Sequence, residues 1–406
     1  MSIVLETFFN DEEVKRFFSP SKILCGNQSR NLLYDVIKPT KKIALFIDHY
    51  FSEHLFIKEL LSKYKSDIVL NIYVNDMPKS GKIDSIIDQL KVLPDVIITI
   101  GGGSTIDTAK AVMAKFMYGT YNEVGIGLKR HIPRIKGINK PIFISIPTTG
   151  GTGADASRYY VVYDSKTKAK IGGKSWHLIA DWIFLDAIFI KSCTDEILIK
   201  CSFDCYTHLF ETLLCKHENS WFTEMIAKDC IPKLINTNND LIIKKNRKDE
   251  NFLSLLYCSA LSGITISNVR TSIMHEAAGA LLENTDLCHA ESLFVFFEET
   301  MNLYKKYIDK KLNPLLFSSK IQSNHIKIHN FKKINDWWEN IFEDYGIKND
   351  IKKSMKNISI SKNELITRIF KRIYSDKVWI EKESPIKLRE KEIKKYIKNS
   401  LNKFDK

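Results

Sequence analysis

The cysteines of this 406-residue chain lack the spacing of redox or zinc-ribbon motifs, since eight are present and no two form a C-x-x-C pair. In a chain of this size they are typical of reduced thiols in a cytosolic protein. The N-terminal stretch lacks a basic region followed by a long apolar run, and no window of eighteen uncharged apolar residues occurs. We therefore expect a cytoplasmic protein without membrane association.

An arginine-rich patch is also missing, although the formal net charge is +13. The basic residues are mostly lysines, scattered along the chain and concentrated after Lys305. This distribution favours a solvated lysine-rich surface over nucleic-acid binding. The chain is too long for one ordinary core, and its 44% hydrophobic and 27% charged residues predict a globular protein of two domains.

The first half alternates strand and helix patterns. Strands are predicted up to Gly26 and at 42–48, 68–74, 96–100 and 141–146, with helices at 52–64, 83–93 and 105–117. This alternation favours an α/β fold with a parallel sheet covered on both faces. Ligands of such sheets bind at the carboxyl ends of strands, where Asp48, Gly101–Ser104 and 147–153 all fall.

The segment I-I-T-I-G-G-G-S-T-I-D-T-A-K-A-V at 97–112 is the most informative local motif. An apolar strand ends in Gly101, Gly102, Gly103 and Ser104, and a helical pattern begins at about Thr105. At such a helix start the N–H groups point outward, the helix dipole favours an anion, and glycines permit close approach. The loop alone leaves two interpretations open, a phosphate cradle and a simple tight turn.

The second half changes character near Cys193. Apolar residues recur at three- and four-residue spacing, which predicts helices at 196–216, 221–235, 250–265, 271–283 and 291–306. We predict an α/β domain at 1–192 and an all-helical domain at 193–406, joined without a disordered linker. The tail from Pro385 to Lys406 predicts a lysine-rich surface helix with Ser384 as its N-cap and a frayed end.

Four potential metal ligands occur in the helical half. Asp204 and His208 are four residues apart, which places both side chains on one face of a helix. His275 lies in a later helix, and His289 follows the helix-breaking sequence E-N-T-D at 283–286. One carboxylate and three imidazoles suit a divalent ion such as Zn²⁺ or Fe²⁺ and leave positions open for substrate.

Side-chain pairs with this four-residue spacing also have an interpretation without a metal ion. An isolated Asp–His pair four residues apart is more often a surface hydrogen bond than a metal site. His325 and His329 have the same spacing, but they lie among Lys and Asn, so we expect both to be solvated.

Four elements in a fixed order, G-G-G-S-T-I-D-T-A-K, I-P-T-T-G-G-T-G-A-D-A-S-R, D-C-Y-T-H and two histidines separated by thirteen residues, resemble the iron-containing (group III metal-dependent) alcohol dehydrogenases. The resemblance runs from about residue 20 to 300 and implies the dehydroquinate-synthase-like fold of that family. Within it, the sequences at 151–158, 204–208 and 264–275 are most similar to the 3-deoxy-D-manno-octulosonate 8-oxidase subgroup.

The resemblance implies a cofactor and a metal ion. The family binds a nicotinamide dinucleotide between its α/β and helical domains, and it binds one divalent ion, Fe²⁺ or Zn²⁺. Residue by residue, the metal ligands match Asp204, His208, His275 and His289.

Further matches concern the dinucleotide. Gly101–Ser104 match the pyrophosphate loop, and Asp48 matches an acidic strand end that accepts the adenosine ribose hydroxyls and favours NAD over NADP. The remaining matches complete the loop motif, line the dinucleotide or lie near the nicotinamide ribose: Asp107, Lys110, Thr148, Thr149, Thr152 and Lys170.

Two positions depart from the family pattern. Many members carry a second histidine four residues after the one matched by His275, and Gly279 occupies that place here. Any proton relay through that residue must therefore differ. The usual Pro-His-Gly at the last ligand is Cys288-His289-Ala290, where the thiol is either packed or close to the metal.

The activity implied is reversible, metal-dependent hydride transfer between an alcohol and a nicotinamide. The subgroup implies oxidation of the C8 hydroxyl of 3-deoxy-D-manno-octulosonate to an aldehyde in lipopolysaccharide synthesis, with an aminotransferase as pathway partner. Arg158 is the candidate for holding the substrate carboxylate, with an ordinary salt bridge as the alternative. We also expect a homodimer.

Three alternatives stay open. In the first alternative, the substrate is a short-chain alcohol, glycerol or phosphonoacetaldehyde. The second is a cyclase like dehydroquinate synthase, in which the dinucleotide is reduced and reoxidised within one turnover. The third is a binding protein built on an enzyme scaffold that has lost its activity.

Overall fold

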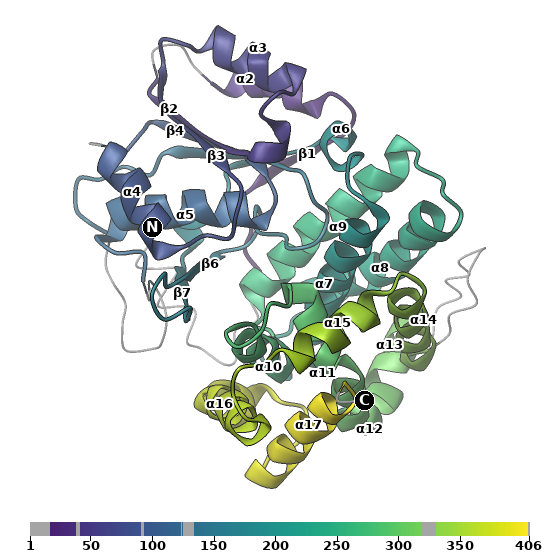
Figure 1. The fold of residues 1–406 in the computed structure, drawn as a ribbon. Coiled ribbons are helices and arrows are strands. Elements are labelled where there is room, and N and C mark those ends of the chain that lie inside the picture. The colour runs from purple at the N-terminus through teal and green to yellow at the C-terminus, as the bar shows by residue number, and fades with distance from the viewer. Residues whose placement is uncertain are drawn as a thin grey trace. The chain divides into compact units, whose positions relative to one another are not determined.

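The computed structural model describes residues 17–37, 41–90, 93–122, 124, 134–317 and 330–404, so His325 and His329 lie outside the described residues. The chain divides into two compact units (Figure 1). The α/β unit holds residues 19–193 and 246–267, and the helical unit holds 194–245 and the described residues from Asn268 onward, with Phe17 and Phe18.

The α/β unit is built on a six-stranded parallel sheet in the order β1-β8-β5-β4-β2-β3. The strands are β1 (Lys22–Cys25), β2 (Ile43–Asp48), β3 (Ile68–Val74), β4 (Val96–Gly101), β5 (Ile142–Pro147) and β8 (Trp182–Leu185). Its helices are α2 (Leu33–Val36), α3 (Leu55–Lys63), α4 (Ser80–Gln89), α5 (Gly103–Tyr118), α6 (Ala187–Ile190) and α9 (Asp249–Asn268).

Both faces of the sheet are covered, as predicted. On one face Leu45 and Ile98 belong to a buried cluster with Phe56 and Leu60 of α3. The alternate residues, such as Phe46, are equally buried, and α5 packs against β2 and β4. Continuous burial of a strand on both sides is the mark of a parallel sheet between helical layers.

Three strands were not predicted. β6 (Tyr159–Tyr163) and β7 (Lys170–Lys174) form an antiparallel hairpin outside the main sheet, and β8 joins the sheet between β1 and β5. β8 has only four residues, and β7 contains Gly172 and Gly173, so neither carries a strong strand pattern.

Helix α9 belongs to the α/β unit although its sequence lies within the predicted helical domain. A Cβ at Gly263 would lie 2.1 Å from the carbonyl oxygen of Gly153. Ser259 Oγ accepts from the N–H of Gly153 at 3.2 Å, and Ser267 Oγ accepts from the N–H of Arg158 at 3.0 Å. The α/β unit therefore includes residues 246–267 in addition to those before the predicted boundary at residue 192. Small side chains on α9 let this helix pack directly on the loop after β5.

Within its described residues the helical unit contains only helices. They are α7 (Asp195–Leu214), α8 (Trp221–Asn238), α10 (Ile273–Leu282), α11 (His289–Leu303), α12 (Lys305–Tyr307), α13 (Asn313–Phe317), α14 (Phe331–Asp344), α15 (Ile347–Lys356), α16 (Lys362–Ser375) and α17 (Glu390–Asn402). Phe203 of α7 centres an aromatic core, with ring centroids of Phe294, Trp338 and Phe342 within 5.6 Å.

The predicted start of the last helix is wrong. α17 begins at Glu390 with Arg389 as its N-cap, and Ser384 instead closes a π-helical turn at Trp379–Glu383. The N–H of Ser384 donates to the Trp379 carbonyl at 2.9 Å, so this residue ends one element rather than starting the next. α17 is also buried along one side, at residues such as Tyr396.

No single helix in the described part of the chain is both long and apolar enough to cross a membrane. Among the same described residues, one bent pair, α9 with α10, reaches that length and composition.

Candidate metal centre and dinucleotide loop

The glycine loop joins β4 to α5. Gly102 is the N-cap of α5 and offers no side chain to the first-turn amides. The N–H groups of Thr105 and Ile106 both donate to the Gly102 carbonyl at 3.1 Å, whereas those of Gly103 and Ser104 find no acceptor in the described part of the chain. Open amides at the start of a sixteen-residue helix suit an oxygen of a pyrophosphate.

Close approach of two loops explains the glycines. A Cβ at Gly102 would lie 3.0 Å from Thr149 Oγ1, and a Cβ at Gly103 would lie 3.0 Å from Thr152 Cγ2. Both threonines belong to the loop that follows β5, which is the strand next to β4. A larger residue at either glycine would therefore require the facing threonine side chain to shift by a few tenths of an ångström.

The other predicted dinucleotide residues lie on two parts of the α/β unit. Asp48 ends β2, where its Oδ1 accepts from the N–H of Tyr50 at 3.0 Å. Buried Thr148 donates its N–H to the Gly101 carbonyl at 3.2 Å. Because β4 lies between β2 and β5, these residues occupy neighbouring strand ends, whereas Lys170 begins β7 in the hairpin.

Asp107 and Lys110 of α5 contact the protein itself. Nζ of fully buried Lys110 donates to three backbone carbonyls between Ala154 and Tyr159. Asp107 Oδ2 accepts from the N–H of Val161 at 3.0 Å. Burial lowers the pKa of Lys110 to about 8 and raises the pKa of Asp107 to about 6. All three Lys110 donors are used, so this residue supports the loop and has none left for a phosphate.

Helix α7 brings the first two predicted metal ligands together. Its N-terminus is capped by Thr194, whose hydroxyl accepts from Ile197 N–H, and its acidic first turn suits the helix dipole. Asp204 and His208 lie three turns further on, 4% and 6% exposed. Nε2 of His208 lies 3.6 Å from Oδ1 of Asp204.

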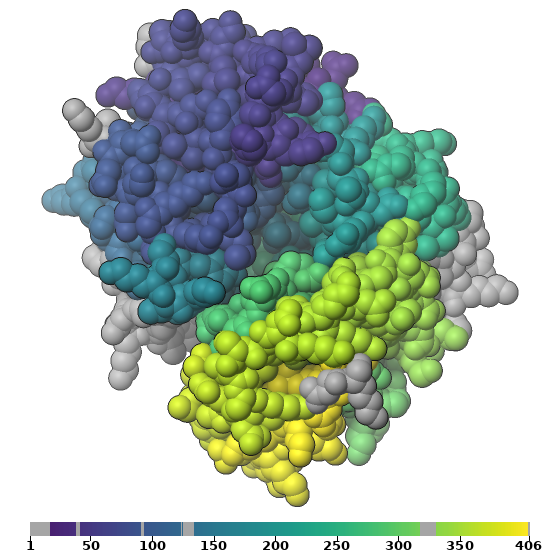
Figure 2. Space-filling model, in the orientation of Figure 1, coloured from purple at the N-terminus to yellow at the C-terminus, as the bar shows by residue number. Residues whose placement is uncertain are grey.

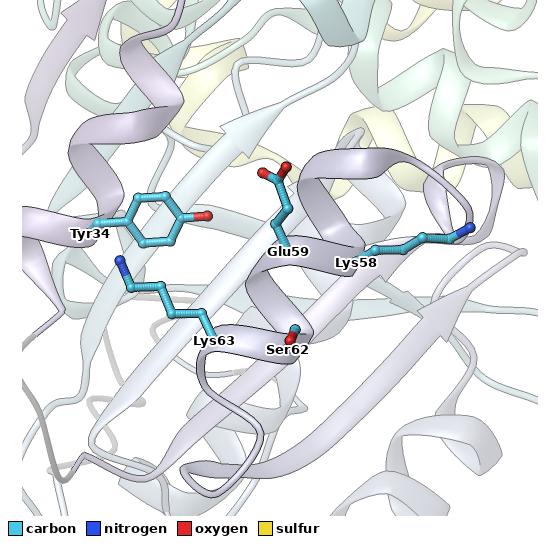
Figure 3. Close-up of a pocket in the computed structure, with 5 residues that line it drawn as sticks. All are labelled: Tyr34, Lys58, Glu59, Ser62 and Lys63. Carbon is cyan, nitrogen blue, oxygen red and sulfur yellow. The ribbon is translucent and has the colours of Figure 1, made fainter.

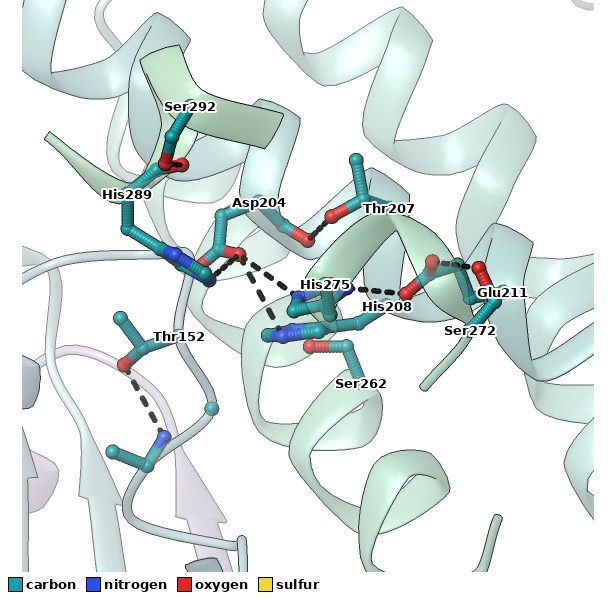
Figure 4. Close-up of polar contacts among 12 residues, drawn as sticks. Thr152, Asp204, Thr207, His208, Glu211, Ser262, Ser272, His275, His289 and Ser292 are labelled. Carbon is teal, nitrogen blue, oxygen red and sulfur yellow. Dashed lines mark hydrogen bonds and ion pairs between the residues drawn. The ribbon is translucent and has the colours of Figure 1, made fainter. Parts of the chain in front are cut away.

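The other two ligands come from α10 and α11 (Figure 4). His275 lies in the first turn of α10, and His289 is the first residue of α11. Their Nε2 atoms lie 3.9 Å and 3.5 Å from Asp204 Oδ1. Two ligands bound to one zinc or iron ion at about 2.1 Å are roughly 3.0–3.5 Å apart. The ligand atoms of Asp204, His208 and His275 all lie within 4.8 Å of one another and could hold one divalent ion. His289 lies beside this group, with its Nε2 close to Asp204.

Glu211 supports this cluster and was not singled out by the sequence patterns. It is fully buried and contacts both Nδ1 of His275 and the hydroxyl of Ser272, the residue that caps α10. A carboxylate on Nδ1 orients the imidazole so that Nε2 faces the other ligands. Desolvation raises the pKa of Glu211 to about 7. The available signal is spacing, since Asp204, His208 and Glu211 recur on one helix face.

A second glutamate fixes the start of α11. Glu291 accepts from the N–H of Cys288 at 2.7 Å and pairs at 2.7 Å with Nζ of Lys200 on α7. Cys288 is the N-cap of the helix, and its thiol accepts from the N–H of Glu291. Cys288, which departs from the family pattern, therefore caps the helix that begins at His289.

Arg158 is held by aromatic rings. Its guanidinium lies 4.8 Å from the ring centre of Trp176 and 5.3 Å from that of Tyr159, whose hydroxyl accepts from Nη2 at 3.3 Å. Within the described residues no carboxylate pairs with it, and its buried Nε has no hydrogen-bond partner. Arg158 therefore forms no ordinary salt bridge with any carboxylate that the structure describes.

A surface cavity of 530 Å³ lies elsewhere on the α/β unit (Figure 3). Its lining residues are Tyr34, Lys58, Glu59, Ser62 and Lys63. Nζ of Lys63 lies 3.9 Å from the ring centre of Tyr34. None of the predicted ligand or cofactor residues lines this cavity.

Three examples illustrate the similarity of this chain to known proteins. The 4-hydroxybutyrate dehydrogenase of Clostridium kluyveri is 27% identical over 219 residues, which cover 53% of this chain and 56% of that protein. The sulfoacetaldehyde reductase of Bilophila wadsworthia is 28% identical over 199 residues, covering 49% and 50%. The matched region spans about half the length of these relatives. A solved iron-containing alcohol dehydrogenase from Thermococcus thioreducens shares the fold, with a TM-score of 0.79 at 18% identity over 95% of this chain and 100% of that one.

Two family models match in sequence. The one described as iron-containing alcohol dehydrogenase matches residues 20–187, and the one described as the C-terminal part of the Fe-containing alcohol dehydrogenase family matches residues 198–401. Because these matches cover both units, the chain belongs to the iron-containing alcohol dehydrogenase family.

Proposed function

We propose that this protein is a metal-dependent, NAD-linked dehydrogenase that oxidises the C8 hydroxyl of 3-deoxy-D-manno-octulosonate to an aldehyde. The observation that carries the proposal is that the Nε2 atoms of His208, His275 and His289 each lie within 3.9 Å of Oδ1 of Asp204. The same chain presents a helix start with open amides after β4, which suits a dinucleotide.

The four gathered side chains would hold one divalent ion, which supplies Lewis-acid chemistry to an alcohol oxygen when bound. The work of the protein is to keep these side chains in place. Glu211 keeps the His275 ring oriented through its contact with Nδ1. Glu291 fixes the backbone that leads into His289.

The dinucleotide supplies the hydride acceptor, and we assign its pyrophosphate to the amides of Gly103 and Ser104. Thr149 and Thr152 line the loop on the side of β5. We assign the adenosine ribose to Asp48, whose carboxylate repels the 2′-phosphate of NADP. NAD is therefore the expected cofactor.

An anionic substrate is supported by two observations. The matched relatives act, by name, on 4-hydroxybutyrate and sulfoacetaldehyde, each of which is an anion with an oxidisable or reducible terminal carbon. The guanidinium of Arg158 is not neutralised by a described carboxylate. We propose that Arg158 holds the carboxylate of the sugar acid. The aldehyde product suits an aminotransferase as the next enzyme in the pathway.

Short aldehydes and alcohols are the second candidate substrates, favoured by the likeness to sulfoacetaldehyde reductase. Of these, phosphonoacetaldehyde is the nearest in charge, and glycerol and simple alcohols are neutral. The neutral alcohols would need no contact with Arg158.

A substrate screen tests the proposal. Purified protein, loaded separately with Fe²⁺ and Zn²⁺, is given NAD or NADP and the eight-carbon sugar acid, 4-hydroxybutyrate, glycerol or a short alcohol, and absorbance of reduced nicotinamide is followed. Sulfoacetaldehyde and phosphonoacetaldehyde are tested with NADH. We expect the highest kcat/KM for the sugar acid with NAD. A higher value for any other compound contradicts the substrate assignment, and light scattering tests the expected homodimer.

A further inference from the structure

We propose that Arg372 of α16 is a positioning residue for the metal centre, which it supports by holding the segment that joins His275 to His289. This inference rests on the metal site of the proposed function. It concerns metal binding and is independent of the substrate and the dinucleotide.

Arg372 bridges two carboxylates of α10. Its Nε donates to Glu276 at 3.0 Å, and its Nη1 donates to Glu283 at 2.8 Å. Glu276 directly follows the ligand His275, and Glu283 is the C-cap of the helix. One guanidinium therefore spans α10 from its ligand-bearing turn to its end. All three side chains are about one-third exposed or less, so water screens these ion pairs only in part.

Gly279 packs against this guanidinium. A Cβ at residue 279 would lie 3.4 Å from both Cζ and Nη2 of Arg372, which is ordinary van der Waals contact. Alanine would therefore fit at this position, whereas a longer side chain would displace the guanidinium. The departure from the family pattern at Gly279 thus coincides with an arginine packed against the backbone one turn beyond His275.

α16 packs against α10 and also contacts the connection from α10 to α11. Arg368, one turn before Arg372, donates from Nη1 to Oδ1 of Asn284 at 2.8 Å. Asn284 lies in the short segment between α10 and α11, which ends at His289. Two arginines of one helix therefore contact the segment between the two ligands at three residues.

This contact matters because the four ligands are not equally fixed. Asp204 and His208 share one helix, so the helix itself sets their spacing. His275 and His289 lie on separate helices, and the distance between them depends on how the joining segment is held. Glu211 fixes the first turn of α10. We infer that Arg372 fixes the rest, because a metal site tolerates only small displacements of its ligands.

The test is metal binding by the full-length, metal-free protein. Co²⁺ is titrated in competition with a chelator, and its visible absorption bands report the ligand geometry. Arg372→Gln is expected to weaken Co²⁺ binding about tenfold or more and to change the bands. The Co²⁺ affinity of Arg372→Lys should lie between those of the wild type and Arg372→Gln, because an ammonium cannot replace both guanidinium contacts. Lys371→Gln is the matched control, since it removes the same charge from an exposed neighbour, and it should bind as wild type.

Gly279→Leu gives an independent test, because its side chain would displace the guanidinium. It should weaken Co²⁺ binding as Arg372→Gln does, and the double variant should be no weaker than either single variant. Unchanged affinity and bands in Arg372→Gln, even with a lower free energy of unfolding, would overturn the proposal. If that variant does not fold, Glu283→Gln takes its place, with a loss of about threefold expected and wild-type affinity counting against the proposal.

Discussion

The glycine loop of the α/β unit and the ligand cluster of the helical unit are built from opposite materials. The loop consists of backbone amides and small side chains in close contact, with Gly102 against Thr149 as an example. The cluster consists of ionisable side chains from three helices, held by further buried carboxylates such as Glu211. Changes in the first region should therefore act through space filling, and changes in the second through charge and orientation.

The largest expected effect is in the ligand cluster. Asp204→Ala removes the one carboxylate that all three imidazoles face, so bound metal should fall to background and turnover should be abolished. Elemental analysis after reconstitution measures the first and NAD reduction the second. Asp229→Ala, which removes a half-exposed carboxylate of α8 paired with Lys233, is the control. Full activity in a metal-free Asp204→Ala protein would refute the proposed role of the metal.

Glu211→Gln should give a smaller effect in the same region. The amide keeps the shape of the carboxylate but holds the His275 ring less firmly, so metal affinity should fall about 10- to 100-fold. Isothermal titration of the metal-free protein with Zn²⁺ measures this change. Glu390→Gln on the exposed first turn of α17 should leave affinity unchanged. Wild-type affinity in Glu211→Gln would show that the contact with Nδ1 does not orient the ligand.

In the α/β unit, Gly263→Ala should act by crowding alone. The added Cβ would lie 2.1 Å from the Gly153 carbonyl oxygen, so α9 and the loop must separate, at a cost of about 3 kcal/mol in the free energy of unfolding. Urea denaturation measures the loss, and Zn²⁺ affinity of the folded protein should be unchanged. Gly81→Ala in α4 is the control, because its Cβ meets only the flexible Ser165 side chain. Equal stability of the two variants would contradict the close packing of α9.

The smallest effect is a pH dependence within the α/β unit. Burial raises the pKa of Asp155 from 3.8 to about 6 in the folded protein. The folded state then holds the proton more tightly than the unfolded state, so this carboxyl stabilises the fold below about pH 4. That contribution is lost as the pH rises through 6. In the wild type, the free energy of unfolding should fall between pH 4 and 6, and Asp155→Asn should reduce this fall by about 1–3 kcal/mol.

Urea denaturation at several pH values measures this fall. Asp88→Asn, at an exposed carboxylate of α4, should follow the wild type. An unchanged slope in Asp155→Asn would show that burial does not shift this group.

Short-range patterns were sufficient for the sheet and for the glycine loop. Strands β2 to β5 end within one residue of their predicted positions, because each is an apolar run followed directly by a polar, glycine or proline residue. The α/β fold with a parallel sheet, followed by a helical unit, is confirmed. The juxtaposition of Asp204 and His208 on α7 was equally predictable, since residues four apart lie on the same face of a helix.

Supporting contacts were not predictable in this way, because they join residues distant in sequence. Glu211 contacts a histidine 64 residues later, and Arg372 contacts Glu276 across 96 residues. The placement of α9 depended on three small residues whose pattern matches any buried helix. Ser384 failed as a cap for a similar reason: its sequence suits a helix start, but the preceding π-helical turn already uses its N–H.

The buried ammonium of Lys110 has a consequence for protein engineering. The segment that follows β5, T-T-G-G-T-G-A-D-A-S-R, has the composition of a flexible linker and would be chosen from sequence as a place to insert a tag or a reporter domain. Lys110 donates to three backbone carbonyls between Ala154 and Tyr159, and α9 packs on Gly153. An insertion in this segment would therefore disrupt close packing. Ser165 in the turn between β6 and β7 is hydrogen-bonded to the start of α4, so the exposed residues 166–168 of that turn are the better insertion point.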